Sequence, residues 1–169
     1  LDTVTLEKLK ITDAGAPNLD RWNQFVQRHK NPKGKVKIGL IGKYVELQDS
    51  YKSILESFIH AGAANEVKVK IVSIHSEHIN ANNVSEELKN LDGILVAPGF
   101  GERGIEGKIE AVRFAREHKL PFLGICLGMQ MAVIEYSRNV LGLKDANSSE
   151  MSKATSNPVI NLMEEQKSI

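Results

Sequence analysis

The chain has 169 residues, 41% of them hydrophobic, and its 22 basic and 21 acidic residues leave a net charge of +1. A chain of this length can bury one core, so we expect one domain with a short appendage. The balanced charge predicts no nucleic-acid binding, the lack of a long apolar run predicts no membrane span, and a single cysteine excludes an internal disulfide. No signal-peptide pattern is present, which favours a cytoplasmic location.

Residues 1–35 are predicted to form a connecting arm. Residues 4–11 and 21–29 are expected to be short helices. Trp22 and Phe25 lie three residues apart on the second of these helices, and we expect them to pin the arm to the domain. Because the sequence begins at Leu1 without a methionine, we also expect it to be a piece of a longer protein.

Residues 36–169 are predicted to form the folded unit. Apolar or alternating runs predict four strands, at 36–42, 66–72, 92–97 and 121–125. Helical periodicity predicts helices at 50–63, 84–91, 105–118 and 127–140. This alternation indicates an α/β fold, a mostly parallel sheet with helices on both faces. The polar alternation of the second strand places it near an edge, and the last helix is expected to bury Met131, Ile134, Tyr136 and Val140.

The only cysteine stands between the last predicted strand and the last predicted helix. Its neighbours read Gly124-Ile125-Cys126-Leu127-Gly128, the thiol version of a nucleophile elbow, in which small residues let a strand turn sharply into a helix. The helix N-terminus favours the thiolate, because the unpaired N–H groups of the first turn carry partial positive charge. Cys126 is therefore a candidate nucleophile. The alternative is a buried core cysteine, but a core strand gains nothing from the two glycines.

Sites in parallel sheets form at the carboxyl ends of the strands, which should bring three loops together. These loops contain Lys43-Tyr44, Pro98-Gly99-Phe100-Gly101 and Cys126. The N–H groups of the glycine-rich loop could point at an oxyanion beside Cys126, and the amide of Leu127 would be the second donor. The alternative is a phosphate-binding loop, but the lysine and spacing of a P-loop and the third glycine of a dinucleotide fingerprint are missing.

The Pro-Gly-Phe-Gly run, followed after a helix by Gly-Ile-Cys-Leu-Gly-Met-Gln, resembles the class I glutamine amidotransferases. More narrowly, residues 42–53, 99–108 and 145–150 are similar to the CTP synthase family. The resemblance covers nearly the whole chain. It implies a flavodoxin-like fold over residues 36–169, as a partial amidotransferase domain that is incomplete at the C-terminus. Residues 1–35 resemble the linker that follows an ATP-dependent synthetase domain.

The resemblance implies that Cys126 attacks glutamine, forms a glutamyl thioester and releases glutamate and ammonia. The ammonia would pass to a synthetase domain that aminates UTP to CTP with ATP, a step of pyrimidine nucleotide biosynthesis. The implied partners are therefore glutamine and that synthetase domain, through which the parent enzyme would form a homo-oligomer. ATP, magnesium and GTP are implied for the parent enzyme, and no cofactor or metal is implied for this domain.

Further residues acquire roles through the same resemblance. Gly99 and Leu127 would supply the oxyanion N–H groups, and Gln130 and Glu150 would hold the substrate, Glu150 through the amino group of glutamine. The positions that would couple GTP binding to glutamine hydrolysis are Arg103, Gly104 and Glu106. Taken without the resemblance, these residues read as a solvated glutamine, a surface glutamate and a charged loop.

The sequence departs from the family pattern in its histidines. The resemblance implies a catalytic histidine and glutamate well beyond the elbow, whereas all five histidines, His29, His60, His75, His78 and His118, precede Cys126. We therefore expect these 169 residues alone to be weakly active or inactive. The alternative is a non-catalytic interaction or regulatory domain with a reactive thiol, and a more distant one is an α/β cysteine hydrolase with a similar elbow.

Overall fold

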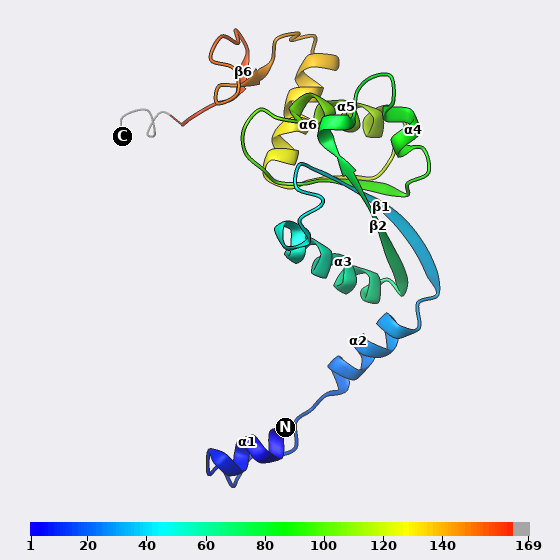
Figure 1. Ribbon diagram of the computed structural model, residues 1–169, viewed down its shortest axis with the longest axis vertical. Helices are drawn as coiled ribbons and strands as arrows, with labels where there is room; N and C mark the ends of the chain where they lie inside the picture. The colour runs from blue at the N-terminus through cyan, green and yellow to red at the C-terminus, as the bar shows by residue number, and fades with distance from the viewer. Residues whose placement is uncertain (164–169) are drawn as a thin grey trace.

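The computed structural model describes residues 1–163 (Figure 1). Two helices, α1 (Asp2–Lys8) and α2 (Asp20–Lys30), precede the sheet and extend from it as an arm. The main elements then follow in the order β1 (Gly34–Gly42), η1 (Gln48–Tyr51), α3 (Lys52–Ala64), β2 (Val67–His75), η2 (Ser76–His78), α4 (Val84–Leu88), β3 (Gly93–Val96), α5 (Ile105–Glu117), β4 (Phe122–Gly124) and α6 (Leu127–Asn139). Two short strands, β5 (Asn147–Ser148) and β6 (Pro158–Ile160), complete the described chain.

The four main strands form one parallel sheet in the order β2-β1-β3-β4. The register pairs Gly34 with Val67, Ile38 with Gly93, and Ile94 with Phe122. β1 and β3 lie in the middle, and the residues of β3 are all buried. The predicted parallel sheet is confirmed, and so is the edge position of the second strand.

Helices cover both faces of the sheet, as the alternation of elements predicts. On one face, α3 packs Ile54, Leu55 and Phe58 against Leu40 and Leu95. The other face is covered by α4, α5 and α6, as Figure 1 shows. The residues of this second cluster include Ile41, Val96, Ile105, Ile109, Val112, Phe114, Met131 and Ile134. The fold is therefore a three-layer α/β arrangement.

Two expectations of burial in the last helix are wrong. Met131 and Ile134 are fully buried, but Tyr136 and Val140 are 49% and 44% exposed. The helix packs on α5, β3 and β4, and β4 is the last strand of the sheet. No described element continues the sheet beyond β4, so apolar side chains on this side, including Leu123 at 57% exposure, face outward.

The arm contacts the domain where α2 packs on α3 and where Lys33 pairs with Glu66. Phe25 of α2 stacks on His60 of α3, with ring centroids 4.9 Å apart. Trp22 stacks on Phe25 at 5.5 Å but remains 59% exposed. The expected contact between arm and domain is therefore confirmed for Phe25. Trp22 packs on Phe25 and supports this contact indirectly.

An ion pair joins the two helices that cover the second face. Glu135 of α6 is 1% exposed and accepts hydrogen bonds from Nε and Nη2 of Arg116 on α5, at 2.8–3.1 Å, and from Asn139. The hydrogen bonds from Arg116 to Glu135 raise the pKa of the guanidinium. A buried carboxylate needs this partner, because an unpaired charge in the interior is costly.

Arg116→Met is expected to lower the free energy of unfolding by about 2 kcal/mol, because it leaves the carboxylate of Glu135 without its cation. The double variant Arg116→Met/Glu135→Gln should recover more than half of this loss. Urea denaturation of both variants measures the effect. Lys89→Met is the control, since it breaks an exposed pair with Glu86 and should cost less than about 0.5 kcal/mol. Equal losses in Arg116→Met and Lys89→Met would contradict the assignment.

A second buried charge has no carboxylate partner. Lys108 lies on the inward face of α5 and is completely inaccessible. Its Nζ donates a hydrogen bond of 3.0 Å to the main-chain oxygen of Ala97, directly after β3. Burial and the neighbouring charge of Lys43 lower the pKa of Lys108 from 10.5 to about 8, and Cys126 opposes this shift. The fold thus holds an ammonium at neutral pH in an environment that disfavours it.

Lys108→Met is expected to raise the free energy of unfolding at pH 7. The folded chain binds this proton more weakly than the unfolded chain, so the buried ammonium destabilises the fold below pH 8. The fall from 10.5 to about 8 corresponds to at most about 3 kcal/mol, and the lost bond to Ala97 offsets about 1 kcal/mol, which leaves a gain of about 2 kcal/mol.

The gain should shrink as the pH rises from 8 towards 10.5, because in this window the folded lysine is neutral while the unfolded one keeps its proton, so rising pH stabilises the wild type. Urea denaturation of wild type and variant at several pH values between 7 and 10 measures the difference. Lys35→Met, at an exposed position of β1, is the control and should show no such trend. A difference between Lys108→Met and wild type that stays constant with pH would refute the cause.

Candidate active site

Cys126 occupies a strained turn between β4 and α6. Its backbone has φ 53° and ψ −109°, a region that side-chain-bearing residues seldom adopt and that costs about 1–3 kcal/mol. Hydrogen bonds hold the turn on both sides, from the N–H of Ile125 to Val96 at 3.1 Å and from the N–H of Gln130 to the oxygen of Cys126 at 3.2 Å. The thiol is free and exposed. The alternative of a buried core cysteine is therefore wrong.

The two glycines of the elbow are required by close contacts. A Cβ at Gly128 would lie 2.1 Å from the main-chain oxygen of Val96, and a Cβ at Gly124 would lie 2.6 Å from the backbone of Gly128. Neither obstacle is a flexible side chain. The glycines therefore allow α6 to begin directly against β3. The elbow pattern predicts small residues at these two positions for this steric reason.

Two main-chain N–H groups near Cys126 are free to donate. Among the backbone hydrogen bonds of residues 1–163, the N–H groups of Gly99 and Leu127 have no acceptor. The two residues are neighbours, since a Cβ at Gly99 would lie 3.6 Å from Cδ2 of Leu127. Leu127 is the first residue of α6, so its N–H also belongs to the partially positive end of a helix.

Two buried lysines hold the loop that contains Gly99. Lys108 donates to the oxygen of Ala97, and Lys43, which is 7% exposed at the end of β1, donates to the oxygen of Phe100. The sequence reasoning assigned no role to either side chain. A signal was present for Lys108, which stands on the same helical face as Ile105, Ile109 and Val112 although it is charged.

Gln130 and Glu150 lie in different parts of the structure. Gln130 is half-buried in the first turn of α6, one turn after Cys126. Glu150 is exposed after β5, which pairs with β6 and packs on α6. Its N–H donates to Oγ of Ser148 at 3.2 Å, and no hydrogen bond or ion pair of its carboxylate is seen within residues 1–163. Its carboxylate is therefore available to a ligand.

The three residues expected to couple GTP binding have structural contacts at the start of α5. Arg103 forms an ion pair with Glu77 at 3.1 Å, and Gly104 adopts φ +76° as the residue before the helix. Glu106 accepts two hydrogen bonds, at 3.0–3.1 Å, from Arg138 near the end of α6. This segment therefore connects η2, which follows β2, with α6, the helix that follows Cys126.

The described hydrogen bonds bring no histidine to Cys126. His118 stacks on Phe114, with ring centroids 4.0 Å apart, before the start of β4. His75 is the last residue of β2 and contacts Glu46 at 3.1 Å, and His78 lies in η2. Residues 1–163 hold no group of three histidine, cysteine, aspartate or glutamate side chains that could bind a metal.

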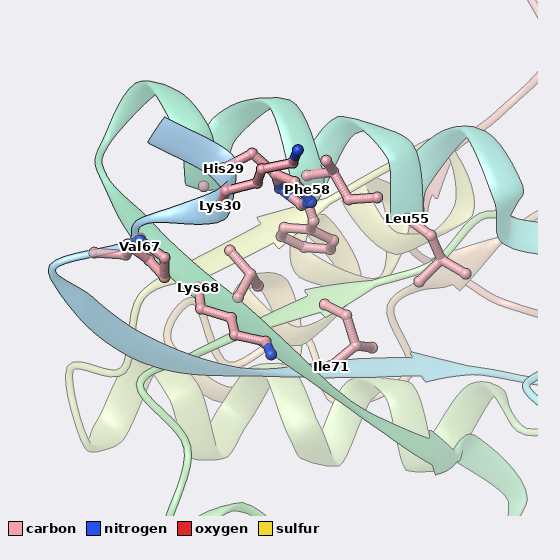
Figure 2. A pocket seen from close by; sticks show the side chains of 11 residues that line it. His29, Lys30, Leu55, Phe58, Val67, Lys68 and Ile71 are labelled. Atoms are coloured by element: carbon pink, nitrogen blue, oxygen red, sulfur yellow. The ribbon is translucent and has the colours of Figure 1, made fainter. Parts of the chain in front are cut away.

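A pocket of about 470 Å³ lies away from the elbow, between α2, α3 and the first half of β2. Figure 2 shows the side chains that line it, including His29, Phe58 and Val67. Because β2 is parallel to β4, this end of the sheet is opposite to the one that holds Cys126. Over the same described residues, no helix has the length and hydrophobicity needed to cross a membrane.

Proteins of known identity resemble this chain in sequence. It is 71% identical over all 169 residues to the CTP synthase of Flavobacterium psychrophilum and 72% identical to that of Christiangramia forsetii. The chain spans 32% and 31% of the length of these relatives, which is about a third.

A solved structure and a protein family also match. The structure, described as "Trypanosoma brucei CTPS - glutaminase domain with bound acivicin", gives a TM-score of 0.73 at 41% identity, over 76% of this chain and 50% of that chain. It agrees with the predicted flavodoxin-like α/β fold. The family described as "Glutamine amidotransferase class-I" matches residues 46–167. Since this match spans most of the chain and contains both the elbow and the glycine loop beside it, the chain belongs to the class I glutamine amidotransferase family.

Proposed function

We propose that this chain is the glutamine-hydrolysing part of a CTP synthase. The observation that carries the proposal is the exposed Cys126 in a strained strand-to-helix turn, next to the free N–H groups of Gly99 and Leu127. The similarity to proteins named CTP synthase supports the narrower assignment. Because the chain spans a third of their length, the amination of UTP is proposed for the whole protein, with the remaining length supplying the synthetase domain.

In the proposed mechanism, the thiolate of Cys126 attacks the side-chain carboxamide carbon of glutamine. The new C–S bond pushes the carbonyl electrons onto oxygen, and the N–H groups of Gly99 and Leu127 stabilise this oxyanion. The C–N bond then breaks, the nitrogen takes up a proton and leaves as ammonia, and a glutamyl thioester remains. Water hydrolyses the thioester to glutamate. The resemblance assigns the proton transfers to a histidine and glutamate C-terminal to these residues.

The other assigned residues bind rather than react. In this proposal Glu150 pairs with the amino group of glutamine, for which an exposed carboxylate without a partner among the described residues is suited. Gln130, one turn after the nucleophile, would also hold the substrate. GTP would act through the segment that contains Arg103, Gly104 and Glu106, because its ion pairs reach both η2 and α6. ATP and magnesium would bind in the synthetase domain.

The test is glutamate release from glutamine by the complete natural protein that carries these residues. Cys126→Ala should reduce this rate by at least about a thousandfold, because the triad acts through its nucleophile. The same variant should still form CTP from ammonia, ATP and UTP, which controls for folding of the whole protein. The 169 residues alone should be much slower than the complete protein.

A glutamyl adduct on the tryptic peptide of residues 120–138, detected by mass spectrometry in the wild type and not in Cys126→Ala, would identify the thioester. If the complete protein makes CTP from ammonia but releases no glutamate from glutamine, hydrolysis is excluded. The chain would then be an interaction or regulatory domain that retains the fold.

A further inference from the structure

The two buried lysines have no part in the hydrolysis described above, yet both contact the loop that carries Gly99. They come from different elements, Lys43 from the end of β1 and Lys108 from α5. Lys108 binds the oxygen of Ala97, and Lys43 binds the oxygen of Phe100. These two carbonyl groups bracket Gly99, so the peptide with the free N–H is held between two fixed points.

The positive charge of Lys108 lies close to the proposed oxyanion site. A Cβ placed on Gly99 would lie 3.6 Å from Nζ of Lys108 and at the same distance from Cδ2 of Leu127. Gly99 therefore lies close to both the ammonium group and the residue that carries the second free N–H. The absence of a side chain at position 99 lets the ammonium group of Lys108 lie close to the backbone of the loop.

No carboxylate neutralises either lysine within residues 1–163, where every ion pair involves other cations. The charged groups that act on Lys108 are Lys43, which has the same sign, and Cys126, which has the opposite sign when it is a thiolate. In a buried setting a charge acts over a longer range than in water, because screening is weak. The thiolate of Cys126 is thus the anion that acts on the charge of Lys108.

We propose that Lys108, together with Lys43, is a positioning residue that fixes the Gly99 loop and stabilises negative charge on Cys126 and on the developing oxyanion. The oxyanion part rests on the proposed function, whereas the thiolate part does not. The charge that this role needs is present at neutral pH and disappears as the pH rises through about 8. The buried ammonium thus destabilises the fold, and its charge serves the reacting site instead.

Alkylation of Cys126 tests this in the complete natural protein, without glutamine. The tryptic peptide of residues 120–138 isolates this thiol from any other cysteine, and its rate of modification is followed against pH with neutral iodoacetamide and with anionic iodoacetate. Lys108→Met removes the charge at nearly constant volume. Lys35→Met, an exposed position on the same sheet, is the control.

Lys108→Met should raise the pH at which alkylation is half-maximal, because the thiolate loses a stabilising charge. It should also lower the ratio of the iodoacetate rate to the iodoacetamide rate by threefold or more, since a local cation favours the anionic reagent. Lys35→Met should change neither. Lys43→Met should lower the ratio in the same direction, and it provides a second variant if Lys108→Met does not fold.

An unchanged pH midpoint and an unchanged ratio in folded Lys108→Met would overturn the proposal. Equal acceleration or slowing of both reagents at a pH where the thiol is fully ionised, with their ratio unchanged, would also overturn it, because a loosened loop alters access for both alike. Failure of the proposed function is distinguishable. A shifted ratio in a protein that releases no glutamate supports the lysine role and refutes glutamine hydrolysis, whereas active hydrolysis with an unshifted ratio refutes only the lysine role.

Discussion

The structure depends on the close approach of α6 to β3 at the elbow. The backbone of Gly128 touches the main-chain oxygen of Val96, and Gly124 touches the backbone of Gly128. This contact leaves no room for side chains and forces Cys126 into positive φ. The strain is borne by a turn whose neighbours are buried in the core, so the surrounding packing holds the cysteine in a conformation that it would not choose by itself. Its thiol is thereby kept outside the core.

The buried charges divide into two kinds. Arg116 and Glu135 neutralise each other between α5 and α6 and serve the packing of the two helices. Lys108 and Lys43 donate hydrogen bonds to main-chain oxygens and pair with no carboxylate within residues 1–163, and both oxygens belong to the loop beside the cysteine. The ion pair has a structural role that accounts for its burial. A buried cation without a carboxylate partner needs another anion, and in our proposal that anion is the reacting group.

Helix α5 links several parts of the proposed site. Its first turn holds Glu106, which binds Arg138 of α6, and Arg138 in turn donates to the oxygen of Ala146 before β5. The same turn holds Lys108, which donates to the glycine loop. A change at the start of α5 would therefore reach the elbow helix, the oxyanion loop and the strand that precedes Glu150 through direct contacts. This arrangement fits the role proposed for that segment, the coupling of GTP binding to glutamine hydrolysis.

The sequence by itself determined the order of strands and helices, the elbow and the two glycines beside Cys126. These features follow from local periodicity and from steric rules that act over a few residues. It could not decide the exposure of Tyr136 and Val140, because that depends on which strand ends the sheet and not on the helix pattern. Nor could it show that Lys108 reaches Ala97 and that Lys43 reaches Phe100. Those contacts join residues from separate elements, so only the packing of α5 and β1 around one loop decides them.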